Sequence, residues 1–114
     1  MTKNYRPLVY ICSKYAGDTE ENIERTRRFC RYAFEQGRIP LSGVLAFTPF
    51  MDDSDPDERG SAIFMDMVLM GKCDELWVLG DEISGGMAIE IERARKRRQK
   101  IRWFNSRFEE VEVL

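Results

Sequence analysis

The carboxylate of Glu90 stands out because it lies near the start of a helix that is led by two glycines. The segment Ser84-Gly-Gly-Met-Ala-Ile-Glu90 puts it one turn into this helix. There it shares a face with Met87, Ile91 and Ala94, next to the packed side of the helix. A carboxylate beside apolar neighbours and above a sheet edge is a candidate for tuned acidity. The alternative is an ordinary charge that favours the positive end of the helix macrodipole, and spacing alone leaves both open.

Two further polar side chains lie in apolar surroundings. Asp66 stands within FMDMVLM, either as a site carboxylate or as part of a polar helix face. Tyr10 stands within PLVYIC, where a core position is the simpler interpretation, although a buried hydroxyl needs a partner. The chain contains no histidine, which excludes Ser-His and Cys-His nucleophile pairs and histidine metal sites. Acid–base chemistry must therefore come from carboxylates, Tyr, Lys or Cys.

No metal site is predicted. The acidic run from Asp52 to Glu58 resembles part of a calcium loop, but Glu58 stands where the glycine is needed and Phe64 where the bidentate glutamate is needed. A solvated loop is the simpler interpretation. The three cysteines (Cys12, Cys30 and Cys73) are far apart, odd in number and read as buried thiols. The basic run from Arg93 to Lys100 complements a helix C-terminus, with a partner or nucleic-acid patch as the alternative.

Length and composition indicate one domain over residues 1–114, with 43% hydrophobic and 33% charged residues. A formal net charge of −2 argues against wholesale nucleic-acid binding. No apolar run approaches the roughly 18 residues that a membrane helix needs. The N-terminal MTKNYRP lacks the apolar core of a signal peptide. We therefore expect a cytoplasmic protein that does not bind membranes.

The elements that must position these groups alternate along the chain. Strands are predicted over 7–12, 38–41, 75–79 and 100–104. Helices are predicted from the capping box of Asp18 and Glu21 to Gly37, from residue 56 or 57 to 70, and from 86 to about 98. The alternation predicts a Rossmann-like, three-layer α/β/α fold with a parallel sheet of four or five strands.

Three details complete this prediction. The irregular segment 42–57 is a candidate lid. The tail 105–114 is left open as a short extra element. The inward faces of the first two helices are predicted from their apolar spacing as Ile23, Thr26, Cys30, Ala33 and Phe34, and as Ile63, Phe64, Met67 and Val68.

Ligands of open parallel sheets bind beyond the carboxyl ends of the strands. Two turns fall there, residues 13–18 and 80–86, and both lead into helix N-termini. Free backbone N–H groups and the macrodipole at such an end suit a phosphate. A phosphate site at this edge is one interpretation, and the alternative is that these are ordinary glycine-containing turns, which are common in such folds.

The pattern Ser84-x-Gly86-x-x-x-Glu90-Ile91-x-x-Ala94 resembles the signature of the nucleoside 2-deoxyribosyltransferase-like superfamily. The spacing of Asp66 and Asp74, and Tyr10 in VYICS, match it as well. The resemblance covers residues 8–104. YICSKYAGDTEENIERTRRF and GKCDELWVLGD are similar to small uncharacterised proteins of bacteria, phages and prophages in this superfamily.

The resemblance implies that Glu90 attacks the anomeric carbon to form a glycosyl-enzyme, with Asp66 as acid and Tyr10 orienting Glu90. Ser84 resembles the serine of the 2'-deoxynucleoside 5'-monophosphate N-hydrolases, whereas the nucleoside transferases have aspartate there. The implied activity is N-glycosidic hydrolysis, or deoxyribosyl transfer, on a nucleotide, without a metal or cofactor. The implied substrate-binding residues are Ser13, Lys14, Tyr15, Gly17, Ser84, Gly85, Gly86 and Met87.

The superfamily also implies a homodimer or a larger homo-oligomer. Two other functions stay open. One is a non-catalytic module that senses or sequesters a nucleotide, and the other is an interaction protein that uses the basic end of the last helix.

Overall fold

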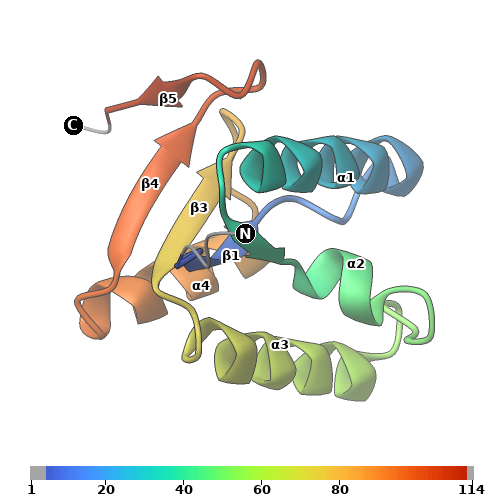
Figure 1. Ribbon diagram of the computed structural model, residues 1–114. Coiled ribbons are helices and arrows are strands. Elements are labelled where there is room, and N and C mark those ends of the chain that lie inside the picture. Colours follow the sequence, from blue (N-terminus) through green and yellow to red (C-terminus); the bar gives the residue numbers. More distant parts are fainter. Residues whose placement is uncertain (1–4, 113–114) are drawn as a thin grey trace.

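The computed structural model describes residues 5–112 as one five-stranded sheet with helices on both faces (Figure 1). The strands follow the order β2-β1-β3-β4-β5. They are β1 (Leu8–Cys12), β2 (Ile39–Leu41), β3 (Glu75–Leu79), β4 (Lys100–Phe104) and β5 (Glu110–Val111). The first four are parallel, and β5 pairs antiparallel with β4. The predicted fold class is confirmed, with one antiparallel pair added to a mostly parallel sheet.

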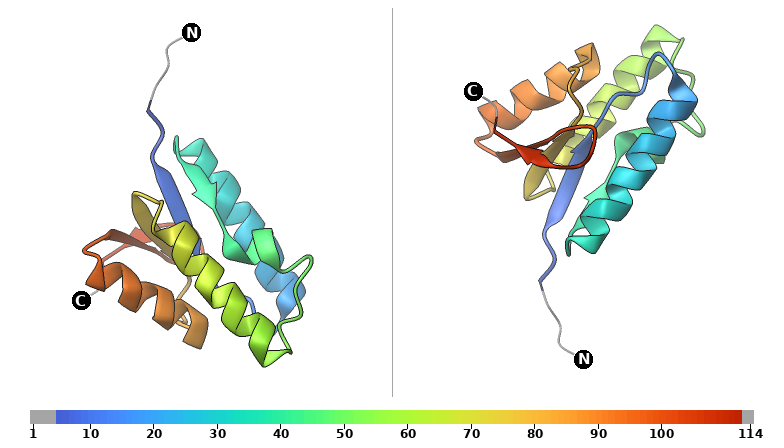
Figure 2. Two further views of the ribbon diagram at one scale, coloured as in Figure 1. Left: turned by 90° about the horizontal axis from the view of Figure 1, so that it is seen from below. Right: turned by 90° about the horizontal axis from the view of Figure 1, so that it is seen from above.

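Four helices cover the sheet: α1 (Thr19–Glu35), α2 (Gly43–Phe47), α3 (Pro56–Met70) and α4 (Gly85–Lys96). Helix α1 packs on one face, while α3 and α4 pack side by side on the other (Figure 2). The short α2 contacts both α1 and α3. None of the helices within residues 5–112 is long and apolar enough to cross a membrane.

Side-chain alternation along β1 divides the core into two clusters. Val9 and Ile11 pack with Phe29 of α1, whereas Tyr10 and Cys12 pack on the α3 and α4 side. This follows from the two-residue period of a strand that is buried on both faces. The register of β1 therefore directs the Tyr10 hydroxyl toward α3 and α4.

The helix ends agree closely with the sequence signals. The Asp18 carboxylate accepts a hydrogen bond from the Glu21 N–H (3.2 Å), although the Glu21 carboxylate contacts Arg25 (3.4 Å) and so completes no capping box. Gly37 has a φ of 79° just past α1, a conformation that favours glycine. The last helix starts at Gly85, one residue before the predicted start, and ends at Lys96.

Two predicted inward faces are partly wrong. In α1 the buried residues are Asn22, Thr26, Phe29 and Ala33. Phe34 is 44% exposed and packs against the guanidinium groups of Arg6 and Arg31 and not into the core. In α3, Met67 and Met70 are buried, whereas Phe64 is 68% exposed and Val68 is also exposed. The apolar stripe of α3 is wider than the surface that the sheet and α4 cover.

Segment 42–57 and the tail, which the sequence did not assign to a helix or strand, each contain a short regular element. Ser42 caps α2 by accepting a hydrogen bond from the Leu45 N–H (3.1 Å), so segment 42–57 begins with a helix. In the tail, both nitrogens of the Arg102 fork donate to Glu110 (2.9 and 2.7 Å) and hold β5 beside β4. Residues 113–114 of the tail lie outside the described residues.

Candidate functional site

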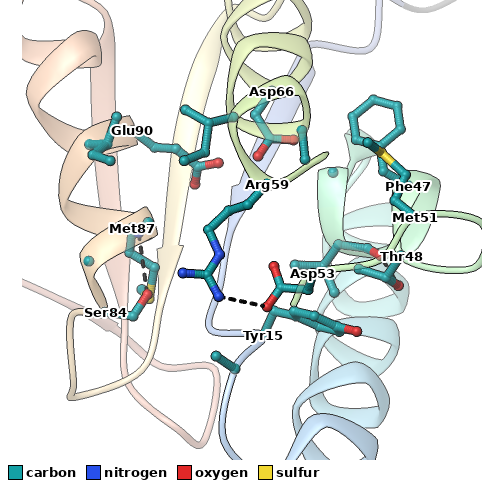
Figure 3. Close-up of a pocket in the computed structure, with 18 of the residues that line it drawn as sticks. Tyr15, Phe47, Thr48, Met51, Asp53, Arg59, Asp66, Ser84, Met87 and Glu90 are labelled. Carbon is teal, nitrogen blue, oxygen red and sulfur yellow. Dashed lines mark hydrogen bonds and ion pairs between the residues drawn. The ribbon is translucent and has the colours of Figure 1, made fainter. Parts of the chain in front are cut away.

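A cavity of about 450 Å³ opens at the carboxyl ends of β1 and β3 (Figure 3). These neighbouring strands form the point where the topology switches, since the chain leaves β1 toward α1 and β3 toward α4 on the opposite face. Ligands of such sheets bind at this point. The wall comes from the turn after β1, α2 with the loop that follows it, α3, and the N-terminus of α4.

Glu90 reaches this cavity from the first turns of α4. The Ser84 hydroxyl caps the helix by accepting a hydrogen bond from the Met87 N–H (3.3 Å), which sets the rotation of the helix. Glu90 then lies on the inner face and is only 9% exposed. Glu92, two residues further on, is exposed.

Tyr10 and Asp66 lie beside Glu90, although they come from β1 and α3. The buried Tyr10 hydroxyl donates a hydrogen bond to Glu90 Oε2 (3.3 Å). Asp66 lines the same cavity, and its Oδ1 is buried without a hydrogen-bond partner among the described residues. Figure 3 shows Glu90 and Asp66 entering the cavity from the two neighbouring helices.

The protonation of this group follows from burial and mutual charge. Burial, followed by the negative charge of Asp66, raises the pKa of Glu90 to about 8. Burial also raises the pKa of Asp66. Burial and the charge of Glu90 raise the pKa of Tyr10, so its hydroxyl stays a donor. At neutral pH the two carboxyls therefore retain a proton between them, which provides one acid and one carboxylate.

Gly43 makes the close approach of α2 to this group possible, and sequence reasoning missed it. A Cβ at this position would lie 2.5 Å from the Tyr10 hydroxyl oxygen, and closer still to Asp66 Oδ1. No side chain fits without moving a catalytic candidate. The serine before it, a capping residue, was the local signal that a helix starts there.

The predicted substrate-binding residues divide into two groups. Ser13, Tyr15, Ser84, Gly85, Gly86 and Met87 line the cavity. Lys14 instead forms an ion pair with Glu82 (3.1 Å) and lines a smaller cavity on the α1 side. Gly17, with a φ of 102°, shapes the turn after β1 and is not among the described lining residues.

Asp74, which contributed to the sequence resemblance, lies away from this cavity. It precedes β3 and accepts hydrogen bonds from the Leu8 N–H (2.8 Å) and the Tyr5 hydroxyl (2.7 Å). These bonds tie the N-terminal segment to the start of β3. Its role in the described structure is therefore to join strands.

The acidic loop contributes to the wall but forms no metal cluster. Asp52 Oδ1 accepts from the N–H and hydroxyl of Ser54 (3.0 and 2.6 Å), and Glu58 accepts from the Asp52 N–H (2.9 Å). Among residues 5–112 no three His, Cys, Asp or Glu side chains are arranged to hold a metal ion. The three cysteines are free thiols, with Cys12 buried and the other two partly buried.

Four other residues of the wall were not predicted to bind substrate, although three of them lie in the segment predicted as a candidate lid. Phe47, Thr48 and Met51 come from α2 and the loop after it, and Arg59 comes from α3. Arg59 extends into the cavity, where it meets Asp53 (3.5 Å; Figure 3). Phe47, Thr48 and Met51 reach the cavity because α2 packs beside it, and the local sequence does not indicate where α2 packs.

Comparison with solved structures shows that the fold is shared with a known enzyme. No curated protein matches the sequence. Among solved structures, the chain is similar to a 2-deoxyribosyltransferase from the psychrotolerant bacterium Bacillus psychrosaccharolyticus. The TM-score is 0.71 at 15% identity, over 94% of this chain and 76% of that one. The fold implied by the sequence resemblance is therefore the fold of the protein.

A family model also matches residues 7–104, which is most of the chain. That family is described as a domain of unknown function, DUF7768. The match runs from just before β1 to the end of β4 and so includes every residue of the Glu90, Asp66 and Tyr10 group. The chain belongs to the DUF7768 family.

Proposed function

We propose that this protein cleaves the N-glycosidic bond of a deoxynucleoside or its monophosphate, by hydrolysis or by deoxyribosyl transfer, with Glu90 as the nucleophile. The observation that carries the proposal is the buried group of Glu90, Asp66 and Tyr10 at one wall of a cavity of about 450 Å³. The cavity has a volume typical of small-molecule sites. The shared fold with a deoxyribosyltransferase supports the same reaction class.

The reaction balances with the groups present. In the reactive form the proton that the two carboxyls share lies on Asp66. An ionised oxygen of Glu90 attacks C1' of the sugar while the C1'–N bond breaks, and the electron pair of that bond leaves with the base. The protonated carboxyl of Asp66 gives its proton to the departing base. Water, or a nitrogen of a second base, then attacks C1' of the glycosyl-enzyme ester and releases Glu90, and Asp66 takes up the proton of that nucleophile. This is the logic of retaining glycosidases.

Tyr10 acts as a positioning residue in this scheme. Its hydrogen bond to Glu90 Oε2 (3.3 Å) orients the carboxylate and disperses part of its charge. The bond also leaves the other oxygen, Oε1, for the attack. Cys12 lies buried beside this group, and burial raises the pKa of its thiol, which makes it a poor competing nucleophile.

The N-terminus of α4 supports a 5'-phosphorylated substrate. Gly85 and Gly86 line the cavity in the first turn of that helix, where backbone N–H groups have no partner within the helix. The hydroxyl of Ser84, used as an acceptor by the cap, still has its proton to donate. Tighter binding of nucleosides than of their monophosphates would contradict this part of the proposal.

The test is release of free base from a panel of nucleosides and nucleotides, followed by chromatography. Glu90→Gln and Glu90→Ala are expected to abolish release. The matched control is Glu92→Gln, which removes an exposed carboxylate two residues away on the same helix. Release that survives both substitutions at position 90 would refute the assignment of the nucleophile.

The second candidate function is a non-catalytic module that binds a nucleotide. The raised pKa of Glu90 favours it, because a protonated carboxyl is a poor nucleophile at neutral pH. Tight binding without base release from any member of the panel would support the module. A homodimer or larger assembly in the cytoplasm stays part of the proposal, and light scattering in solution would test the assembly.

A further inference from the structure

Arg59 is the one cationic side chain among the described residues that line the main cavity. It comes from the second turn of α3 and is 58% exposed, so its guanidinium is free to change partners. The opposite wall carries Ser84, Gly85 and Gly86 at the N-terminus of α4. A monoester phosphate that enters the cavity therefore has backbone donors on α4 and one exposed cation on α3.

Asp53 holds this cation in an ion pair. The pair is separated by 3.5 Å, and the Asp53 side chain is 41% exposed (Figure 3). Exposed ion pairs of this kind contribute little to stability, because water already solvates both groups. A phosphate offers the guanidinium two acceptor oxygens in a planar, bidentate arrangement and more negative charge. The exchange of partner from carboxylate to phosphate is therefore favourable for Arg59.

The neighbouring acids are in a different situation. Asp52 accepts two hydrogen bonds from Ser54, and Glu58 accepts one from the backbone of Asp52. These bonds build the loop between α2 and α3. Asp53 is the acid of this loop whose carboxylate reaches Arg59, so it competes directly with an anionic ligand.

We infer that Arg59 binds the 5'-phosphate of the substrate after it leaves Asp53, and that this pair determines the preference for a nucleotide over a nucleoside. The inference rests on the proposed function for the nature of the ligand, a nucleoside or its monophosphate. It adds a specificity-determining residue, which the sequence pattern around Glu90 does not contain. Asp53 acts through Arg59 and by repulsion of the phosphate.

The test is calorimetric binding of the four common 2'-deoxynucleosides and their 5'-monophosphates in a Glu90→Gln background, where the proposed turnover is blocked. We expect this background to bind the best monophosphate at least about tenfold more tightly than its nucleoside. Adding Arg59→Gln should weaken monophosphate binding by about tenfold or more, as expected for a lost charged hydrogen bond, and change nucleoside binding less than twofold. Adding Arg31→Gln, at an exposed ion pair on α1, should change neither.

Two aspartate variants separate competition for Arg59 from general repulsion. Asp53→Asn frees Arg59 and should tighten monophosphate binding severalfold. Asp52→Asn removes the same charge from the same loop but leaves the Arg59 pair intact, so its effect should be smaller. Equal effects of the two would overturn the role of Asp53, and an Arg59→Gln variant that keeps the preference would overturn the role of Arg59. If the Glu90→Gln background itself binds nucleosides more tightly than their monophosphates, both roles are overturned.

The binding results are independent of catalysis. If the Glu90-containing protein releases no base while the preference still depends on Arg59, the proposed reaction fails and this inference stands. If base is released but Arg59→Gln leaves the preference unchanged, the reaction stands and this inference fails.

Discussion

Replacing Glu90 by glutamine is expected to stabilise the fold at mildly alkaline pH while it abolishes base release. Folding raises the pKa of Glu90 from 4.5 to about 8, first through burial and then through the charge of Asp66. Between these pH values the unfolded chain has lost the proton and the folded chain keeps it. The free energy of unfolding therefore falls as pH rises, by about 1.4 kcal/mol per pH unit. Glutamine has nearly the same shape, still accepts the Tyr10 hydrogen bond and never ionises.

The magnitude is large enough to measure. Between pH 6 and pH 8, the titration of Glu90 lowers the free energy of unfolding of the unmodified protein by roughly 2 kcal/mol. The Glu90→Gln variant does not lose this stability. The stability that the folded protein gains by holding the Glu90 proton is fully present below the unfolded pKa of Glu90. It is lost as pH rises through the folded pKa of Glu90. Urea unfolding followed by the fluorescence of the buried Trp77 measures it, because the transition midpoints of the two proteins should diverge with pH.

Glu92→Gln provides the control, since position 92 is exposed on the same helix. Its stability should follow that of the unmodified protein at every pH. Titration of the groups that do not interact with Glu90 is common to the three proteins and cancels in the differences. A constant difference between Glu90→Gln and the unmodified protein from pH 6 to pH 8 would refute the reasoning, because Glu90 would then not be a buried acid.

Two further predictions concern the groups around Glu90. Tyr10→Phe removes the hydroxyl that donates to Glu90 Oε2, so base release should fall about tenfold, the worth of one such hydrogen bond, while circular dichroism should report an unchanged fold. An unchanged rate would exclude a positioning role for this hydroxyl. Gly43→Ala would push a methyl group against Asp66 and Tyr10, so we expect a loss of about 1–3 kcal/mol in thermal or urea unfolding together with lost activity. Gly60→Ala, on α3 with no atom near the new methyl group, should instead stabilise the helix by up to about 1 kcal/mol, and equal effects of the two would contradict this account of Gly43.

Most of the fold could be predicted from local patterns of apolar and turn-forming residues. The strands Glu75–Leu79 and Lys100–Phe104 have the predicted bounds, because short apolar runs between turns have few other ways to satisfy their backbone. The inward faces of the helices were harder to predict. Phe34 and Phe64 match the apolar period of their helices and are nevertheless exposed. Periodicity reports which face is apolar, but not how much of that face a neighbour covers.

In the candidate site too, some features follow from neighbouring residues and others from partners that are distant in the sequence. The Ser84 cap and the spacing to Glu90 are local, and they already determine which face of α4 carries the carboxylate. Lys14 was predicted near the ligand because it follows β1, yet its ion pair with Glu82 turns it toward the other cavity. That partner comes from the turn after β3, far away in the sequence.

Local sequence patterns predict the order of the four parallel strands and the three long helices, the glycine-led start of α4 and the absence of histidine chemistry. Each of these depends on neighbours within a few residues, or on composition alone. Packing of distant segments makes Glu90 a buried acid and brings Tyr10 and Asp66 beside it. The same packing leaves no room for a side chain at position 43 and places Arg59 against Asp53. Burial and charge coupling are properties of segments packed against each other, so the pKa of Glu90 is raised only when α3, α4 and β1 come together.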